Sequence, residues 1–151
     1  MSVATIRKSC LAVTSILIAL FAVPALAQDA RAYAEGNVLE VTSVLTKPGM
    51  FDEYMKFLAS TYRQEMEELK KIGVVVDYDI YQTMPRHPGD PDLYLVVTYA
   101  NMAVFDTLED KSEAIEKKLF GSRKQAAEGM ASRESIRTIL GSEIVRELKL
   151  K

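Results

Sequence analysis

The sequence predicts an α+β domain with two layers, in which four antiparallel strands form a sheet and two helices cover one of its faces. Three observations lead to this fold class. Four segments are rich in β-branched and aromatic residues, two segments repeat apolar residues at helical spacing, and the segments follow in the order β-α-β-β-α-β. An amino-terminal export signal precedes them.

Residues 1–27 are typical of a cleavable signal peptide. Arg7 and Lys8 form a basic start, an uncharged apolar run follows over 11–23, and cleavage is expected after Ala27, in a small-x-small pattern. The apolar run would span only about 20 Å as a helix, against about 30 Å for the hydrocarbon core of a bilayer. We therefore expect a periplasmic or secreted protein with no stable membrane span after cleavage.

Composition limits the chemistry of the mature chain. Cleavage removes Cys10, the only cysteine, and with it any disulfide, thiolate nucleophile or cysteine metal site. The chain has 19 basic and 21 acidic side chains, so the loss of Arg7 and Lys8 changes the net charge from −2 to −4. This balance argues against nucleic-acid binding. The remaining length suits a single domain, expected over residues 37–151.

The first half of that domain is expected to be a strand followed by a long helix. Residues 28–36 are small and polar and are interpreted as a flexible leader, and 37–46 alternate like a strand. The helix over 51–72 has one apolar stripe and should end at Gly73. Its stripe consists of Phe51, Tyr54, Met55, Leu58, Tyr62, Met66, Leu69 and Ile72.

The second half is expected to begin with a hairpin. Strands over 74–84 and 92–100 flank a proline-rich loop. Asn101 then resembles the N-cap of a short helical turn.

A longer helix should start at Asp110, whose pairing with Glu113 resembles a capping box. Gly121 and Gly129 should bend or divide it. A last strand over 136–148 completes the order, with Gly141 as a bulge or a point of close approach.

Two β-α-β units of this split kind build a ferredoxin-like sheet. Its two helices can cover only one face. On the other face, Tyr94 and Val96 are mixed with Thr98, which makes that face half apolar. A second copy of the same sheet is the simplest cover for such a face, so a homodimer is expected.

The segments KPGMFDEYMKFL and YLVVTYAN, with the closing strand after a long helix, resemble the dimeric α/β-barrel superfamily. That superfamily includes antibiotic-biosynthesis-type monooxygenases, EthD-like proteins and NIPSNAP-like proteins, and the chain is similar to its small exported bacterial members of unassigned function. The resemblance implies two facing sheets in a dimer, with a pocket between sheet and helices in each protomer. It also implies enzymes that often need no metal or cofactor, and some relatives that bind haem through a histidine.

Two departures weaken the haem and monooxygenase interpretations. The only histidine, His87, lies in the proline-rich loop, and the chain has no tryptophan. His87 could act as a general base or a metal ligand, but a histidine between two prolines in a loop is more often simply exposed. A metal site would need Asp90 and Asp92 as further ligands, and the spacing of those aspartates is more typical of a turn. We expect no metal and no cofactor.

The candidate ligand-binding residues form two groups. Tyrosines are expected to meet between the first helix and the sheet, where they would bind an aromatic or lipid-like molecule or serve as ordinary core. Carboxylates on one face of the second strand, beside Tyr81 and Glu40, would form an acidic cluster that acquires acid-base character if it is buried. The tyrosines are Tyr54, Tyr62, Tyr78 and Tyr94, and the carboxylates are Asp77 and Asp79.

Three functions remain open at this point. The favoured one is an exported dimer that binds a small apolar or aromatic molecule, or another envelope protein. The alternative is a cofactor-independent monooxygenase- or isomerase-like enzyme for an aromatic or polyketide-like substrate, which predicts a buried polar pair in the pocket. Haem binding, the third, requires a histidine that faces the pocket.

Overall fold

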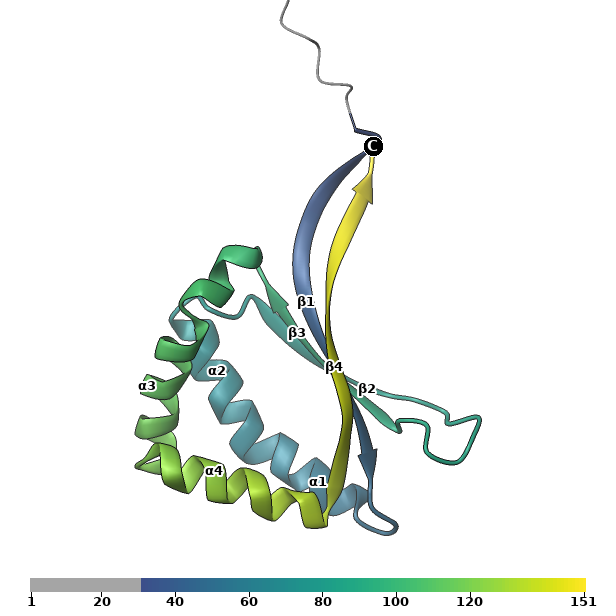
Figure 1. The fold of residues 1–151 in the computed structure, drawn as a ribbon, viewed down its shortest axis with the longest axis vertical. Coiled ribbons are helices and arrows are strands. Elements are labelled where there is room, and N and C mark those ends of the chain that lie inside the picture. Colours follow the sequence, from purple (N-terminus) through teal and green to yellow (C-terminus); the bar gives the residue numbers. More distant parts are fainter. Residues whose placement is uncertain (1–30) are drawn as a thin grey trace, which may run out of the picture. The chain divides into compact units, whose positions relative to one another are not determined.

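The computed structural model describes residues 31–151, so the predicted signal peptide and the start of the leader lie outside the described residues. Four antiparallel strands form one sheet in the order β2-β3-β1-β4, which is the ferredoxin-like arrangement (Figure 1). The predicted fold class is confirmed. The strands are β1 (Tyr33–Thr46), β2 (Asp77–Gln82), β3 (Leu93–Tyr99) and β4 (Arg137–Leu150).

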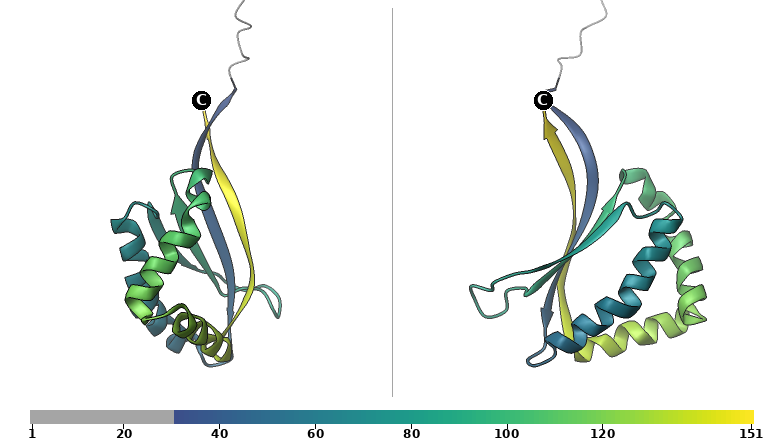
Figure 2. Two further views of the ribbon diagram at one scale, coloured as in Figure 1. Left: turned by 60° about the vertical axis from the view of Figure 1, so that its left-hand side comes forward. Right: turned by 180° about the vertical axis from the view of Figure 1, so that it is seen from behind.

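The helices all lie on one face of this sheet (Figure 2). The first is continuous through α1 (Phe51–Phe57), a π-helical turn η1 (Leu58–Tyr62) and α2 (Arg63–Lys71). The second predicted helix is divided, as expected, into α3 (Leu108–Phe120) and α4 (Arg123–Ser132). Short 3-10 turns, η2 (Met102–Asp106) and η3 (Arg133–Ser135), precede and follow them.

Local sequence signals explain where these helices end. Gly73 has φ +72° directly after the first helix, and Gly121 has φ +84° at the break between α3 and α4, a backbone region that glycine enters without steric cost. Asn101 caps η2, since its side-chain oxygen accepts a hydrogen bond from the Ala103 N–H at 2.9 Å. Asp110 starts no helix. It lies in the first turn of α3, which begins at Leu108.

The strands differ from their predicted bounds at the ends. Residues 33–36, assigned to the flexible leader, belong to β1, where Tyr33 pairs with Leu150 of β4. The strand expected from residue 74 begins only at Asp77, because Val74 and Val75 turn into the core. In β4 the register shifts beside Gly141, with Leu140 as the extra residue. The predicted bulge therefore lies one residue away from Gly141.

The core between sheet and helices consists of two apolar clusters. One gathers around Val38, Met66 and Val97, and the other around Val44, Tyr54 and Leu58. The residues of β1 that face the helices run Val38, Glu40, Thr42, Val44, because side chains alternate along a strand. The two polar members of that series lie between the clusters, where an uninterrupted core would need apolar side chains.

The opposite face of the sheet carries no helix in the described part of the chain (Figure 2). Three cross-strand rows make up this open face, and each row mixes apolar and polar groups. The rows are Asp77-Thr98-Leu39-Val145, Asp79-Val96-Val41-Glu143 and Tyr81-Tyr94-Ser43-Gly141. None of the helices within residues 31–151 has the length and apolar character needed to cross a membrane.

Candidate functional site

A cavity of about 280 Å³ opens between the two core clusters, bounded by the helix-facing side of the sheet, α2 and α3. It lies there because Glu40 and Thr42 interrupt the apolar series of β1. Its walls combine five apolar residues with six polar ones. The apolar walls are Met66, Leu69, Leu95, Val97 and Leu108, and the polar lining is Glu40, Thr42, Tyr62, Glu65, Tyr99 and Ser112.

A tyrosine and a carboxylate form a hydrogen-bonded pair in this cavity. The Tyr99 hydroxyl donates to Glu40 Oε2 at 3.0 Å, and Ser142 Oγ donates to Glu40 Oε1 at 3.2 Å. Burial and the negative charge of Glu40 both raise the pKa of Tyr99, so the phenol stays protonated. The pair places a fixed carboxylate and a fixed hydroxyl at the cavity wall.

Tyr62 is the polar group without a partner. Its hydroxyl is buried and forms no hydrogen bond with any described residue. Burial, reinforced by neighbouring Tyr54 and Glu65, raises its pKa well above the usual value, so the group is a neutral donor. A buried hydroxyl without a partner costs stability, and a ligand atom in the cavity would supply the missing hydrogen bond.

Glu65 adds a second carboxyl group from α2. Burial raises its pKa above the ordinary value, and the charge of Glu116 raises it further, while Arg133 opposes the shift. Its protonated form therefore persists to higher pH than that of an exposed glutamate. A carboxyl group of this kind is suited to donate or accept a proton.

The first helix positions Tyr62 at the end of its π-helical turn. Leu58–Tyr62 form this turn, in which backbone hydrogen bonds join residues five apart and not four apart as in the α-helical segments on either side. Tyr62 consequently packs against both core clusters, and its ring meets the Tyr78 ring edge-on at 6.0 Å. Such turns occur frequently at functional sites.

The structure places three of the four predicted tyrosines on the helix side of the sheet, but only Tyr62 lines the cavity. Tyr54 is buried in the second core cluster, where burial raises its pKa and the charge of Arg137 partly opposes this. Tyr78 donates to Glu67 Oε1 at 2.9 Å. The Tyr78 ring packs against Tyr62, and neither Tyr54 nor Tyr78 lines the cavity.

The other predicted residues lie on the open face. Tyr94 is beside Tyr81 there, so it does not meet the remaining tyrosines. Asp77 and Asp79 share that face, whereas Glu40 points to the helices, so the expected acidic cluster is not assembled. The hydrogen bond from Lys70 Nζ, at 2.9 Å, lowers the pKa of Asp77.

The loop residues have structural contacts. His87 is exposed, and its backbone N–H donates to Asp90 Oδ2 at 2.9 Å. Asp92 accepts hydrogen bonds from the Thr46 backbone N–H at 3.1 and 3.2 Å. Within residues 31–151, no three His, Cys, Asp or Glu side chains come together as a metal site.

Sequence reasoning missed Glu65 and Tyr99 and assigned Glu40 to the other face. The available signal was Glu40 and Thr42 between Val38 and Val44, because two polar residues on the inward side of a strand mark a gap in the core. Glu65, next to Met66 on the helical stripe, gave a weaker signal.

Comparison with known proteins identifies the fold. No protein-family model matches the chain, and no curated protein matches it in sequence. Among solved structures, HapK from Hahella chejuensis superimposes with a TM-score of 0.50 at 10% identity, over 73% of this chain and 91% of HapK. SO0527 from Shewanella oneidensis (TM-score 0.46, 15% identity, 78% of this chain and 96% of that one) is a weaker match. A dimeric ferredoxin-like protein from an uncultured marine organism gives 0.43 at 11% identity, with the same coverage of both chains. The chain has a ferredoxin-like fold.

Proposed function

We propose that the protein is an exported homodimeric domain that binds a small apolar or aromatic molecule in the cavity between sheet and helices. The observation that carries this proposal is Tyr62, which lines the cavity and whose buried hydroxyl has no hydrogen-bond partner within residues 31–151. A ligand with one polar atom and an apolar body would complete that hydrogen bond and fill the space. Export rests on the signal peptide predicted from the sequence of residues 1–27.

The size and chemistry of the cavity define the ligand. A cavity of about 280 Å³ is at the small end of the range for small-molecule sites, so a molecule of one or two rings fits it best. Hydroxyl and carboxyl groups at one wall would orient the polar atom of the ligand, whereas Met66, Leu69 and Leu95 would surround the rest.

A cofactor-independent isomerase- or monooxygenase-like enzyme is the second candidate. It is favoured by one specific observation, the tyrosine–carboxylate pair of Tyr99 and Glu40 beside Glu65, whose raised pKa suits proton transfer. In this case the bound molecule would be converted. In the binding protein it would be released unchanged.

An envelope protein is the remaining partner predicted from the sequence. It would use the open face of the sheet, which the homodimer also requires. We favour the second copy because every row of the open face carries apolar or aromatic side chains, which a second copy of the same sheet would cover.

Binding of 2-naphthol tests the proposal. This probe combines two aromatic rings with one hydroxyl, and the absence of tryptophan leaves its fluorescence free of protein background. We expect saturable binding to the mature protein, weakened roughly 3- to 10-fold by Tyr62→Phe through loss of one hydrogen bond. Tyr81→Phe, on the open face, should bind like the wild type.

Two results would oppose the proposal. Equal affinity in the wild type and the Tyr62→Phe variant would remove the role of this hydroxyl, and no saturable binding would remove the site. Native mass spectrometry of protein purified from the periplasm then identifies a co-purifying molecule by its mass. A molecule that is chemically changed after incubation would favour the enzyme.

A further inference from the structure

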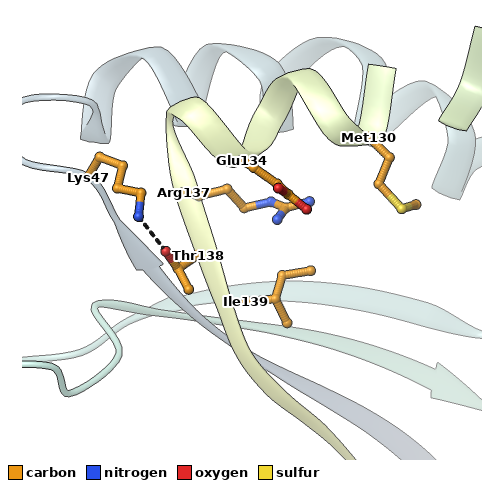
Figure 3. Close-up of a pocket in the computed structure, with 6 residues that line it drawn as sticks. All are labelled: Lys47, Met130, Glu134, Arg137, Thr138 and Ile139. Carbon is orange, nitrogen blue, oxygen red and sulfur yellow. Dashed lines mark hydrogen bonds between the residues drawn. The ribbon is translucent and has the colours of Figure 1, made fainter. Parts of the chain in front are cut away.

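A second cavity, of about 430 Å³, lies where α4 leads through η3 into β4 (Figure 3). Its lining differs from that of the first cavity, the tyrosine cavity lined by Tyr62 and Tyr99, because it carries two basic side chains. Lys47 enters from the end of β1, and Arg137 from the first residue of β4. The remaining lining residues are Met130, Glu134, Thr138 and Ile139.

Arg137 is the most unusual residue of this cavity. It is only 7% exposed and is the one buried charged residue within residues 31–151. It forms no ion pair with any described carboxylate. Its guanidinium lies 5.9 Å from the centre of the Tyr54 ring, so an aromatic face is its partner on one side. Removing a charge from water without a counter-ion is costly, and an anion in the cavity would offset that cost.

A neighbouring group, Arg133, adds positive charge, and the negative charge of Glu65 opposes it only in part. Arg133 lies 4.4 Å over the Phe57 ring, and its Nε is buried with no hydrogen-bond partner among the described residues. Burial lowers the pKa of Arg133, and the charge of Arg137 lowers it further, which means that the two guanidinium groups repel each other. An anion between or beside them would relieve this repulsion.

The carboxylates near the cavity do not neutralise these charges. Asp92 directs both oxygens at Thr46, the residue that pairs with Arg137 across the sheet. Glu134 lines the cavity but makes no ion pair with Lys47 or Arg137 in the described structure. The lining therefore keeps a net positive charge.

Two basic side chains border this space. Lys47 Nζ donates a hydrogen bond of 2.8 Å to Thr138 Oγ1, and this pair lies on the other side of the β4 ribbon from Arg137 (Figure 3). Met130 and Ile139 supply apolar surface on the remaining sides, with exposed fractions of 56% and 47%. A site with a guanidinium, an ammonium and two apolar side chains is suited to an oxyanion attached to an apolar group.

We propose that this cavity binds the anionic end of a small amphiphilic molecule, with Arg137 and Lys47 as the anion-binding residues and Met130 and Ile139 against its apolar part. The anion is an oxyanion, either a carboxylate or a phosphate. This site is separate from the tyrosine cavity, and the proposal does not depend on the function assigned there.

Calorimetric titration of the mature protein with octanoate, and separately with inorganic phosphate, tests the site at low ionic strength. We expect octanoate to bind and Arg137→Gln to weaken binding at least about tenfold, since a charge-assisted hydrogen bond contributes about 1.5 to 3 kcal/mol and about 1.4 kcal/mol is tenfold. Lys47→Gln should weaken it by a smaller factor. Lys111→Gln, an exposed lysine on α3, is the matched control and should leave affinity unchanged.

Glu134→Gln is a second variant that tests the same site if the Arg137 variant fails to fold. Removal of this negative charge should tighten octanoate binding a few-fold, the opposite direction to Lys47→Gln. Stronger binding of phosphate than of octanoate, with the same dependence on Lys47 and Glu134, would support the site and identify a phosphate ligand. Binding of neither anion, or affinity that Lys47→Gln and Glu134→Gln leave unchanged, would overturn the proposal. The 2-naphthol result is independent of each outcome.

Discussion

At the scale of single residues, the Tyr62 hydroxyl distinguishes the tyrosine cavity, because it forms no hydrogen bond that would stabilise the folded state. Tyr78 and Tyr99 each donate to a carboxylate, at 2.9 and 3.0 Å, so their hydroxyls contribute to the folded state. Tyr62 lies in the same layer and has no such partner within residues 31–151. The three tyrosines therefore provide an internal comparison between a structural hydroxyl and one available for a ligand.

The Tyr62→Phe variant should be more stable than the wild type in the absence of ligand. Removal of an unpaired buried hydroxyl relieves a desolvation cost of about 1 kcal/mol or more, while the ring and its packing remain. For a domain of this size we expect Tm to rise by a few degrees, measured by circular dichroism.

Tyr78→Phe is the matched control, because it removes a hydroxyl that is paired with Glu67. Its Tm should fall. A decrease in Tm of similar size in both variants would show that the Tyr62 hydroxyl already has a hydrogen-bond partner in solution. It would then not be available to a ligand.

At the scale of elements, the parts of the fold that depend on local sequence patterns were predicted better than the parts that depend on pairing between distant segments. The stripe from Phe51 to Ile72 predicted the first helix almost to the residue, because helical periodicity and the stop at Gly73 are local. The strand ends were less predictable. Val74 and Val75 have strand propensity but turn into the core, and residues 33–36 join β1 only because residues near Leu150 pair with them.

The candidate site was also only partly predictable, because it depends on which side of the sheet the helices cover. Alternation put Val38, Glu40, Thr42 and Val44 on one side of β1, yet the sequence does not reveal which side the helices cover. Glu40 was therefore grouped with Asp77 instead of with Tyr99. Once the helix-facing side is known, the cavity follows from the sequence of this one strand.

The contact between α2 and α3 gives the prediction at this scale. Glu68 on α2 accepts hydrogen bonds from Lys71, at 2.8 Å, and from Lys118 on α3. These bonds lower the pKa of Glu68 from 4.5 to about 2. A lowered carboxyl pKa means that the pairing contributes stability above pH 4.5 and loses that contribution as the pH falls toward 2.

Glu68→Gln should therefore lower Tm at pH 7, with a difference from the wild type that shrinks as the pH falls from 4.5 toward 2. Glu53→Gln is the control, since within residues 31–151 Glu53 pairs with Lys56 of its own helix alone, at 3.2 Å, and should have a smaller effect. Thermal melts over this pH range measure both variants. A Glu68 difference that does not change with pH would contradict the charge-based explanation.

At the scale of the whole molecule, the long strands β1 and β4 and the open face require an explanation. Both strands have 14 residues, against 6 and 7 for β2 and β3, so they project beyond the rest of the sheet as a two-stranded ribbon (Figure 1). Leu148 and Leu150 near its tip are 55% and 86% exposed. Apolar side chains on a projecting ribbon and on an open sheet face favour burial against a second copy.

Two adjacent residues of β4 test which face forms this dimer. Val145 pairs with Leu39 on the open face, and Ile144 pairs with Glu40 on the helix side, although both are partly exposed. If the open faces meet, Val145→Glu places an unpaired charge in the interface and should shift the protein to monomers. Ile144→Glu introduces the same charge one residue away and should leave the dimer intact. Light scattering coupled to size-exclusion chromatography measures both. A monomeric wild type, or equal dissociation by the two variants, would refute dimerisation through the open face, and that face would then be available to a different protein.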